Sequence, residues 1–76
     1  MERKSWKEKL IEELRKGKNI IEIMNKLKLF PYGFCLLSIL PILKEEGFSM
    51  EELEEIIDQA KSVIGEKFAE NLKKEI

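Results

Sequence analysis

The feature that most constrains the fold of this chain is a run of fifteen residues without a charged side chain, from Leu29 to Leu43. Nearly every side chain in the run is apolar, so its periodicity says little about secondary structure. Pro31 suits the first turn of a helix, whereas Pro41 removes a backbone donor and clashes with the preceding turn. The run therefore predicts a helix over residues 32–45 that is kinked or broken at Pro41.

The composition of this helix determines its surroundings. A helix that is apolar on all sides must be surrounded by other apolar groups. A run of fifteen residues with two prolines is too short for a membrane span, which needs roughly 20 residues. We therefore expect the run to be covered by protein, and we expect no membrane segment.

Two shorter helices are predicted before the uncharged run. Ser5 and Glu8 form a capping box that opens a helix over residues 6–16, and Gly17 suits the left-handed residue that follows it. Asn19 opens a second helix over residues 19–28 in the same way. The short link between the two helices favours an antiparallel or sharply crossed pair.

A third capping box, Ser49 with Glu52, opens a helix predicted over residues 49–75. Unbroken, it would span about 40 Å at 1.5 Å per residue, whereas a compact chain of this size has a radius of gyration near 11 Å. Either the helix bends at Gly65 and folds back, or its last turns pack on something outside the chain. The whole chain, residues 1–76, is predicted to be one all-α domain, a small bundle of four to five helices.

The chain contains no histidine and one cysteine, Cys35. These counts exclude a disulfide within the chain, zinc sites of clustered Cys and His, and catalytic triads with a His base. The four glycines are isolated, so no glycine-rich phosphate loop is present. We expect no enzymatic activity, no catalytic residues, no cofactor, no metal site and no small-molecule substrate.

The first thirty residues are charged and lack the apolar run of a signal peptide, which indicates a cytoplasmic protein. Lys, Glu, Ile and Leu are enriched in the chain. This enrichment is typical of proteins from hot-living organisms, and equally of a genome poor in G and C.

Three amphipathic helices of so short a chain can scarcely cover the uncharged run on every side. The sequence therefore predicts a non-enzymatic protein-interaction or regulatory module. It would self-associate through the uncharged run and the long last helix, as a homodimer, or bind another protein. The residues predicted for the core or this interface are Phe30, Tyr32, Phe34, Leu37, Leu40, Phe68 and Leu72.

Charge is distributed unevenly. Residues 1–30 carry nine Lys or Arg against five Asp or Glu, a net +4, and residues 31–76 carry five against ten, a net −5. The alternative function is therefore a helix-turn-helix-like transcriptional regulator that binds nucleic acid through its basic half. Its candidate contacts are Lys4, Lys7, Arg15, Lys16, Lys18, Lys26 and Lys28.

Two observations limit this alternative. The net charge of the whole chain is −1. The helix that would enter the major groove offers Ser38 as its only polar side chain between residues 34 and 43.

An acidic cluster opens the last helix, from Glu51 to Asp58. It suits the positive helix end and would bind a basic partner, such as the N-terminal half of a second subunit.

Overall fold

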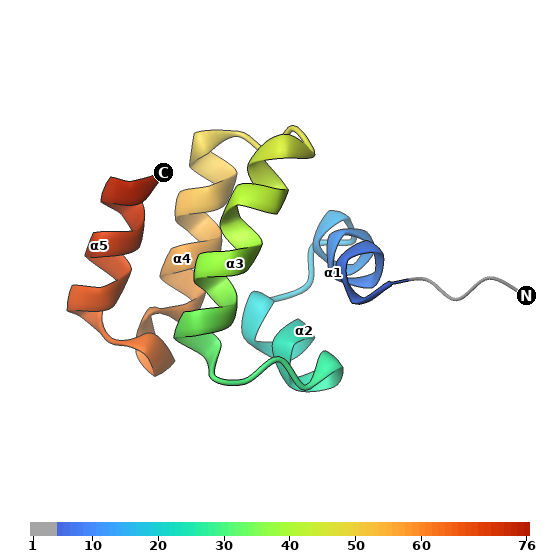
Figure 1. Ribbon diagram of the computed structural model, residues 1–76, viewed down its shortest axis with the longest axis horizontal. Coiled ribbons are helices and arrows are strands. Elements are labelled where there is room, and N and C mark those ends of the chain that lie inside the picture. Colours follow the sequence, from blue (N-terminus) through green and yellow to red (C-terminus); the bar gives the residue numbers. More distant parts are fainter. Residues whose placement is uncertain (1–4) are drawn as a thin grey trace, which may run out of the picture.

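The computed structural model describes residues 5–76, and these residues form five helices and no strand. In chain order the helices are α1 (Trp6–Arg15), α2 (Ile20–Leu27), α3 (Tyr32–Glu45), α4 (Met50–Ile64) and α5 (Glu66–Glu75). Figure 1 shows α3, α4 and α5 side by side and α1 and α2 at one end of this group, with α2 packed against α4. The predicted all-α bundle of four to five helices is confirmed.

Side-chain caps define the starts of α1, α2 and α4. The Ser5 hydroxyl accepts a hydrogen bond from the backbone N–H of Glu8, and Asn19 accepts one from the first turn of α2. At α4 both halves of the capping box are present, because Ser49 Oγ accepts from the Glu52 N–H and Glu52 Oε1 accepts from the Ser49 N–H. Each cap satisfies a backbone donor that the first helical turn leaves unpaired, so observed and predicted starts agree within one residue.

Pro41 does not break α3, which continues as one helix from Tyr32 to Glu45. Of the two predicted forms, a helix over residues 32–45 that is kinked at Pro41 or one that is broken there, the broken form is not observed. Pro41 and Leu37, whose carbonyl would have accepted the missing hydrogen bond, both lie on the exposed side of α3. On that side water can satisfy the free carbonyl, which lowers the cost of the proline.

Gly65 separates α4 from α5 and has φ 92° and ψ 148°, a conformation outside the helical region. The helix predicted over residues 49–75 therefore bends at Gly65, and α5 folds back along α4 (Figure 1). Ala69 and Leu72 of α5 are buried within the chain. Of the two predicted arrangements, an overhanging helix and a bend at Gly65, the described residues adopt the second.

A close approach between α3 and α5 depends on Gly33. A Cβ atom placed on Gly33 would lie 3.1 Å from Cζ of the Phe68 ring. Because glycine has no side chain, the ring can rest directly on the first turn of α3. This contact covers part of Phe68 and positions α5 against the end of α3 that begins the uncharged run.

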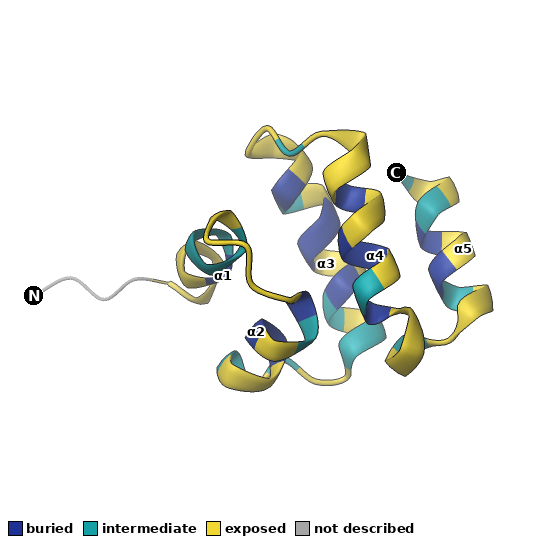
Figure 2. Ribbon diagram, turned by 180° about the vertical axis from the view of Figure 1, so that it is seen from behind, coloured by how far each residue is buried: buried dark blue, intermediate teal, exposed yellow. Residues whose placement is uncertain are grey.

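The core contains side chains from all five helices, and no polar side chain of the described residues is fully buried. Figure 2 shows the buried positions of α3 and α4 facing each other at the centre of the molecule. Burial of each large aliphatic side chain stabilises the fold by about 1.5–3 kcal/mol relative to its exposure. The buried residues are Leu10, Ile20, Ile23, Met24, Leu36, Ile39, Leu40, Leu43, Leu53, Ile56, Ile57, Ala60, Ala69 and Leu72.

One hydrogen bond joins α2 to α4 across the core edge. Gln59 Oε1 of α4 accepts from the backbone N–H of Ile20, at 2.9 Å. Ile20 is the first residue of α2, so its N–H has no partner within the helix. The contact satisfies a donor beside the core and fixes the position of α2 on α4.

Candidate protein-interaction surface

The side of α3 that faces away from the core is apolar and exposed. Phe34 is 74% exposed and Leu37 is 42% exposed, and Pro41 lies on the same side. At 100° per residue these positions fall on one side of the helix, opposite the buried positions of α3. The sequence predicts that this helix is surrounded; the described residues cover only one side of it.

A groove adjoins this side of α3. It has a volume of about 330 Å³, and no charged side chain lines it. Trp6 of α1 and Phe30 of the α2–α3 link, 39% and 56% exposed, form part of its wall. The other lining residues are Leu29, Pro31, Phe34, Cys35 and Ser38.

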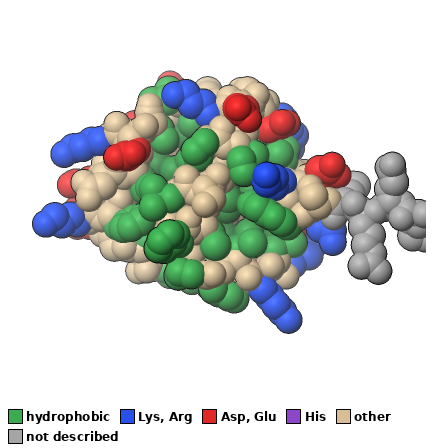
Figure 3. Space-filling view, viewed as in Figure 1, with side chains coloured by type: hydrophobic (Ala, Val, Ile, Leu, Met, Phe, Trp, Pro, Cys, Tyr) green, Lys and Arg blue, Asp and Glu red, His purple; other side chains and the backbone are tan. Residues whose placement is uncertain are grey.

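We call Trp6, Phe30, Phe34 and Leu37 the apolar face. Figure 3 shows hydrophobic side chains gathered over α3 and toward α1 and α2 on this side of the molecule. A whole aromatic side chain has about 150–250 Å² of surface, so the exposed fractions leave roughly 400 Å² of apolar area in contact with water. A patch of about 300–600 Å² is the largest that a typical monomer exposes, and such patches are often binding sites.

The seven residues predicted for the core or an interface divide into three groups. Phe30, Phe34 and Leu37 are exposed, whereas Leu40 and Leu72 are each 2% exposed and belong to the core of the same chain. The other two, Tyr32 and Phe68, are half-buried.

The half-buried pair also has partners inside the chain. The Tyr32 hydroxyl donates a hydrogen bond to Asn25 Oδ1. The Tyr32 and Phe30 rings pack edge to face, with their centroids 5.2 Å apart. Phe68 rests on Gly33. The exposed part of the predicted set is therefore confined to α3 and the link before it, and α5 contributes no exposed residue of that set.

Trp6 belongs to the apolar face but not to the predicted set. In the sequence it begins the apolar stripe of the first helix, four residues before Leu10, and that spacing indicates a core position. Leu10 is indeed fully buried, but Trp6 lies one turn beyond the core. The Lys7 ammonium lies 5.8 Å from the centroid of the Trp6 ring, within cation–π distance.

Most of the described cations of the basic half have partners inside the chain. Lys18 and Lys26 both pair with Glu13, at 2.9 and 3.1 Å, and Lys16 pairs with Glu12 at 3.7 Å. Arg15 stacks over the Phe48 ring at 5.1 Å. These four cations are exposed, as are Lys7 and Lys28, and Lys4 lies outside the described residues.

Glu13 neutralises part of this basic surface. Hydrogen bonds from the Lys18 and Lys26 ammonium groups lower the pKa of Glu13 to about 2, and the same contact raises the pKa of Lys18. The carboxylate therefore stays ionised at any pH near neutrality. Because Lys18 lies in the α1–α2 turn and Lys26 in α2, Glu13 also ties α1 to α2.

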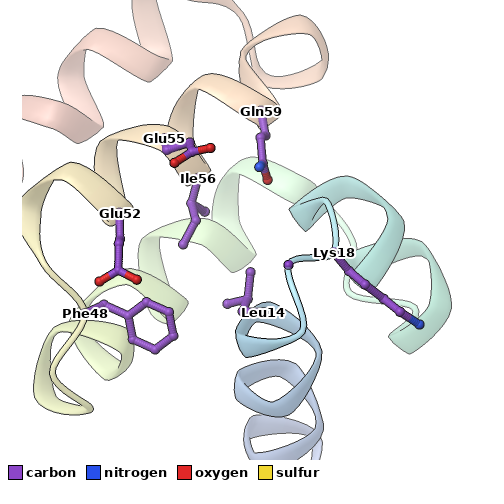
Figure 4. A pocket seen from close by; sticks show the side chains of 8 residues that line it. Leu14, Lys18, Phe48, Glu52, Glu55, Ile56 and Gln59 are labelled. Atoms are coloured by element: carbon purple, nitrogen blue, oxygen red, sulfur yellow. The ribbon is translucent and has the colours of Figure 1, made fainter.

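A second, smaller hollow lies between the end of α1, the α3–α4 link and α4 (Figure 4). Its volume is about 140 Å³, below the 300–1,000 Å³ of most ligand pockets. Two of its polar side chains serve the fold: Gln59 accepts a hydrogen bond from Ile20, and Glu52 caps α4, which lowers the pKa of Glu52. The hollow is lined by Leu14, Gly17, Lys18, Phe48, Glu52, Glu55, Ile56 and Gln59.

Within residues 5–76, no three Cys, Asp or Glu side chains converge in a way that could hold a metal ion. In the acidic cluster of α4, Asp58 instead pairs with Lys73 of α5 at 2.6 Å. No single helix of the described part is long and apolar enough to cross a membrane. Helices α2 and α3 reach that length and composition only together, as a pair bent by 107°.

Comparison of the chain with protein-family models, with curated proteins and with solved structures gives no match.

Proposed function

We propose that this protein is a non-enzymatic protein-interaction module whose binding surface is the apolar face. The observation that carries the proposal is the exposure of Phe34, at 74%, in the middle of a face that also exposes Trp6 and Phe30. Large aromatic side chains beside an uncharged groove are typical of interface anchors, because their burial contributes most of the binding free energy.

The surface differs from the one expected from the sequence in one respect. Self-association through the last helix would need Leu72 to be accessible, and Leu72 is buried against its own chain. Self-association through the uncharged run needs only the exposed side of α3. The proposal therefore assigns binding to α3, the link before it and Trp6 of α1, and not to α5.

The nucleic-acid alternative has weaker support. Lys16, Lys18 and Lys26 are held in ion pairs with glutamates, so fewer cations are free to displace counterions from phosphates. The exposed side of α3 presents Phe34 and Leu37, which cannot read base edges by hydrogen bonding. Binding to duplex DNA at about 50 mM salt, falling steeply with added salt, would favour the alternative.

A photo-crosslinking amino acid placed at position 34 tests the proposal in the cells that produce the protein. Position 63 is the matched control, because Val63 is also exposed, at 47%, but lies on α4 outside the apolar face. We expect a discrete protein adduct from position 34 and none from position 63. No adduct from position 34, or equal adducts from both positions, would contradict the proposal.

A further inference from the structure

We infer that the partner bound by the apolar face is a second copy of this chain, with the two α3 helices packed antiparallel and each Phe34 inserted into the groove of the other copy. The inference rests on the proposed function and names its partner. Three features of the described residues support it: the position of Phe34 beside the groove, the charges at the two ends of α3, and the area of the apolar face.

Phe34 and the groove lie next to each other on one surface, since Phe34 itself lines the groove rim. A two-fold dimer needs such self-complementarity, because each copy must present both the inserted side chain and its receptor. A cavity of about 150 Å³ accepts a benzene ring, so the groove, at about 330 Å³, has room for a phenyl group. If the two-fold axis passes α3 midway between Phe34 and Ser38, each Phe34 lies opposite the partner's Ser38, which lines the groove.

The two ends of the exposed side of α3 carry opposite charges. Glu45 continues the stripe of Phe34, Ser38 and Pro41, because these four positions fall within about 60° of one another at 100° per residue. At the other end Lys28 directly precedes Leu29, which lines the groove, and the Lys7 ammonium lies 5.8 Å from the centroid of the Trp6 ring, which also lines it. Both lysines and Glu45 are exposed.

Antiparallel packing brings the Glu45 end of each α3 to the Lys28 end of the other. Parallel packing would instead bring Lys28 to Lys28 and Glu45 to Glu45. The exposed Lys44 neighbours Glu45, but it lies toward the edge of the stripe, on the side of Leu37. Charge complementarity therefore selects the antiparallel arrangement, which also opposes the two helix dipoles favourably.

The area is compatible with a small stable dimer. Roughly 400 Å² of apolar surface per chain forms the centre, and a standard interface buries about 800 Å² per partner with a polar rim. The rim of this interface would contain Lys28, Pro41 and Glu45, all of which are exposed in the single chain.

Mass in solution tests the pairing. Light scattering behind a sizing column, at two well-separated concentrations, should give twice the chain mass of 9.0 kDa for the unmodified protein. Phe34→Glu should give a monomer, and Val63→Glu, a control at another exposed apolar residue outside the apolar face, should remain a dimer. Circular dichroism checks that both variants keep their helices, which the exposure of both positions allows.

Charge reversal tests the orientation. Lys28→Glu and Glu45→Lys should each raise the dimer dissociation constant about three- to tenfold, because two symmetry-related exposed pairs become repulsive. The protein that carries both reversals should return to within about twofold of the original dissociation constant, since the restored pairs are of the same exposed kind. The antiparallel arrangement would be overturned if Phe34→Glu gives a monomer but the protein with both charge reversals keeps the weakened dissociation constant of the single reversals.

Two other outcomes overturn the inference. A monomer at every concentration would exclude the second copy as partner, but it would leave the proposed function standing if crosslinking from position 34 still captured a different protein. A dimer that persists in Phe34→Glu would place the interface elsewhere on the chain. That result, together with an absence of adducts from position 34, would overturn the proposed function as well.

Discussion

Replacement of Gly65 by alanine tests the bend that separates α4 from α5. Gly65 has φ 92° and ψ 148°, and an ideal Cβ placed on it meets no atom within 4 Å. Steric collision with the rest of the chain is therefore absent, and the effect of Gly65→Ala depends on backbone conformation alone. The variant has two ways to fold, and each of them costs free energy.

If the bend is kept, alanine must hold a conformation that is open mainly to glycine, at a cost of about 1–3 kcal/mol. If α4 and α5 join into one straight helix, alanine gains about 1 kcal/mol over glycine in helix propensity. The straight helix, however, removes Leu72 from the core, which alone costs about 1.5–3 kcal/mol, and also exposes Ala69 and part of Phe68. We therefore expect Gly65→Ala to lower the free energy of unfolding by about 1–3 kcal/mol, with α5 still docked in most molecules.

Urea denaturation followed by circular dichroism measures the free energy of unfolding, and amide hydrogen exchange measures the protection of α5. Gly47→Ala is the matched control, because Gly47 also has a positive φ, 95°, and open space around it, but lies in the α3–α4 link. It should lower stability without a selective loss of protection in α5. A neutral or stabilising Gly65→Ala would refute the reasoning, because it would mean that the straight helix is the lower state.

Three further predictions concern packing, capping and charge. Phe34→Ala should change the stability of the single chain by less than about 0.5 kcal/mol, whereas Leu36→Ala, at a fully buried neighbour, should cost about 2–5 kcal/mol in denaturation at low protein concentration. Gln59→Leu should cost about 1–3 kcal/mol in the same assay, because it leaves the part-buried Ile20 N–H without its acceptor, and Gln59→Glu, which keeps an acceptor oxygen, should cost less. Glu13 has a pKa of about 2 in the folded chain against an ordinary value of 4.5, so the unfolded chain binds more protons between these values and stability falls with acidification through that window. Unfolding measured against pH should show that Glu13→Gln destabilises the protein at neutral pH and that this difference shrinks toward pH 2; a constant difference would contradict the ion-pair origin of the shift.

The helix starts could be predicted from the sequence because the signals are local. Ser5, Asn19 and Ser49 cap backbone donors a few residues away, so neither their effect nor their recognition needs tertiary contacts. The effect of Pro41 could not be predicted in this way. Whether a proline breaks a helix depends on which side of the helix loses the hydrogen bond, and the uncharged run has no periodicity that distinguishes the exposed side of α3 from the buried one.

The candidate site could be predicted only in part, because the uncharged run has no periodicity that separates its exposed positions from its buried ones. The run from Leu29 to Leu43 identifies α3 and the link before it as the segment with excess apolar surface, and Phe30, Phe34 and Leu37 of the predicted set are exposed. Leu40 and Leu72 are core residues, and Trp6 is exposed. Hydrophobicity alone does not separate these positions, because core and interface anchors are the same residue types.

By itself, the amino-acid sequence determined where the first four helices start, because capping residues, a proline in the first turn and apolar stripes act within one or two turns. It also determined that the uncharged run would carry more apolar surface than the other helices could cover. The tertiary structure alone decided which side of α3 stays exposed and that α5 folds back at Gly65. It also decided that Lys16, Lys18 and Lys26 form ion pairs with Glu12 and Glu13. Those outcomes depend on contacts between residues distant in the chain, and the free energy of such contacts is set by packing geometry and not by any local pattern.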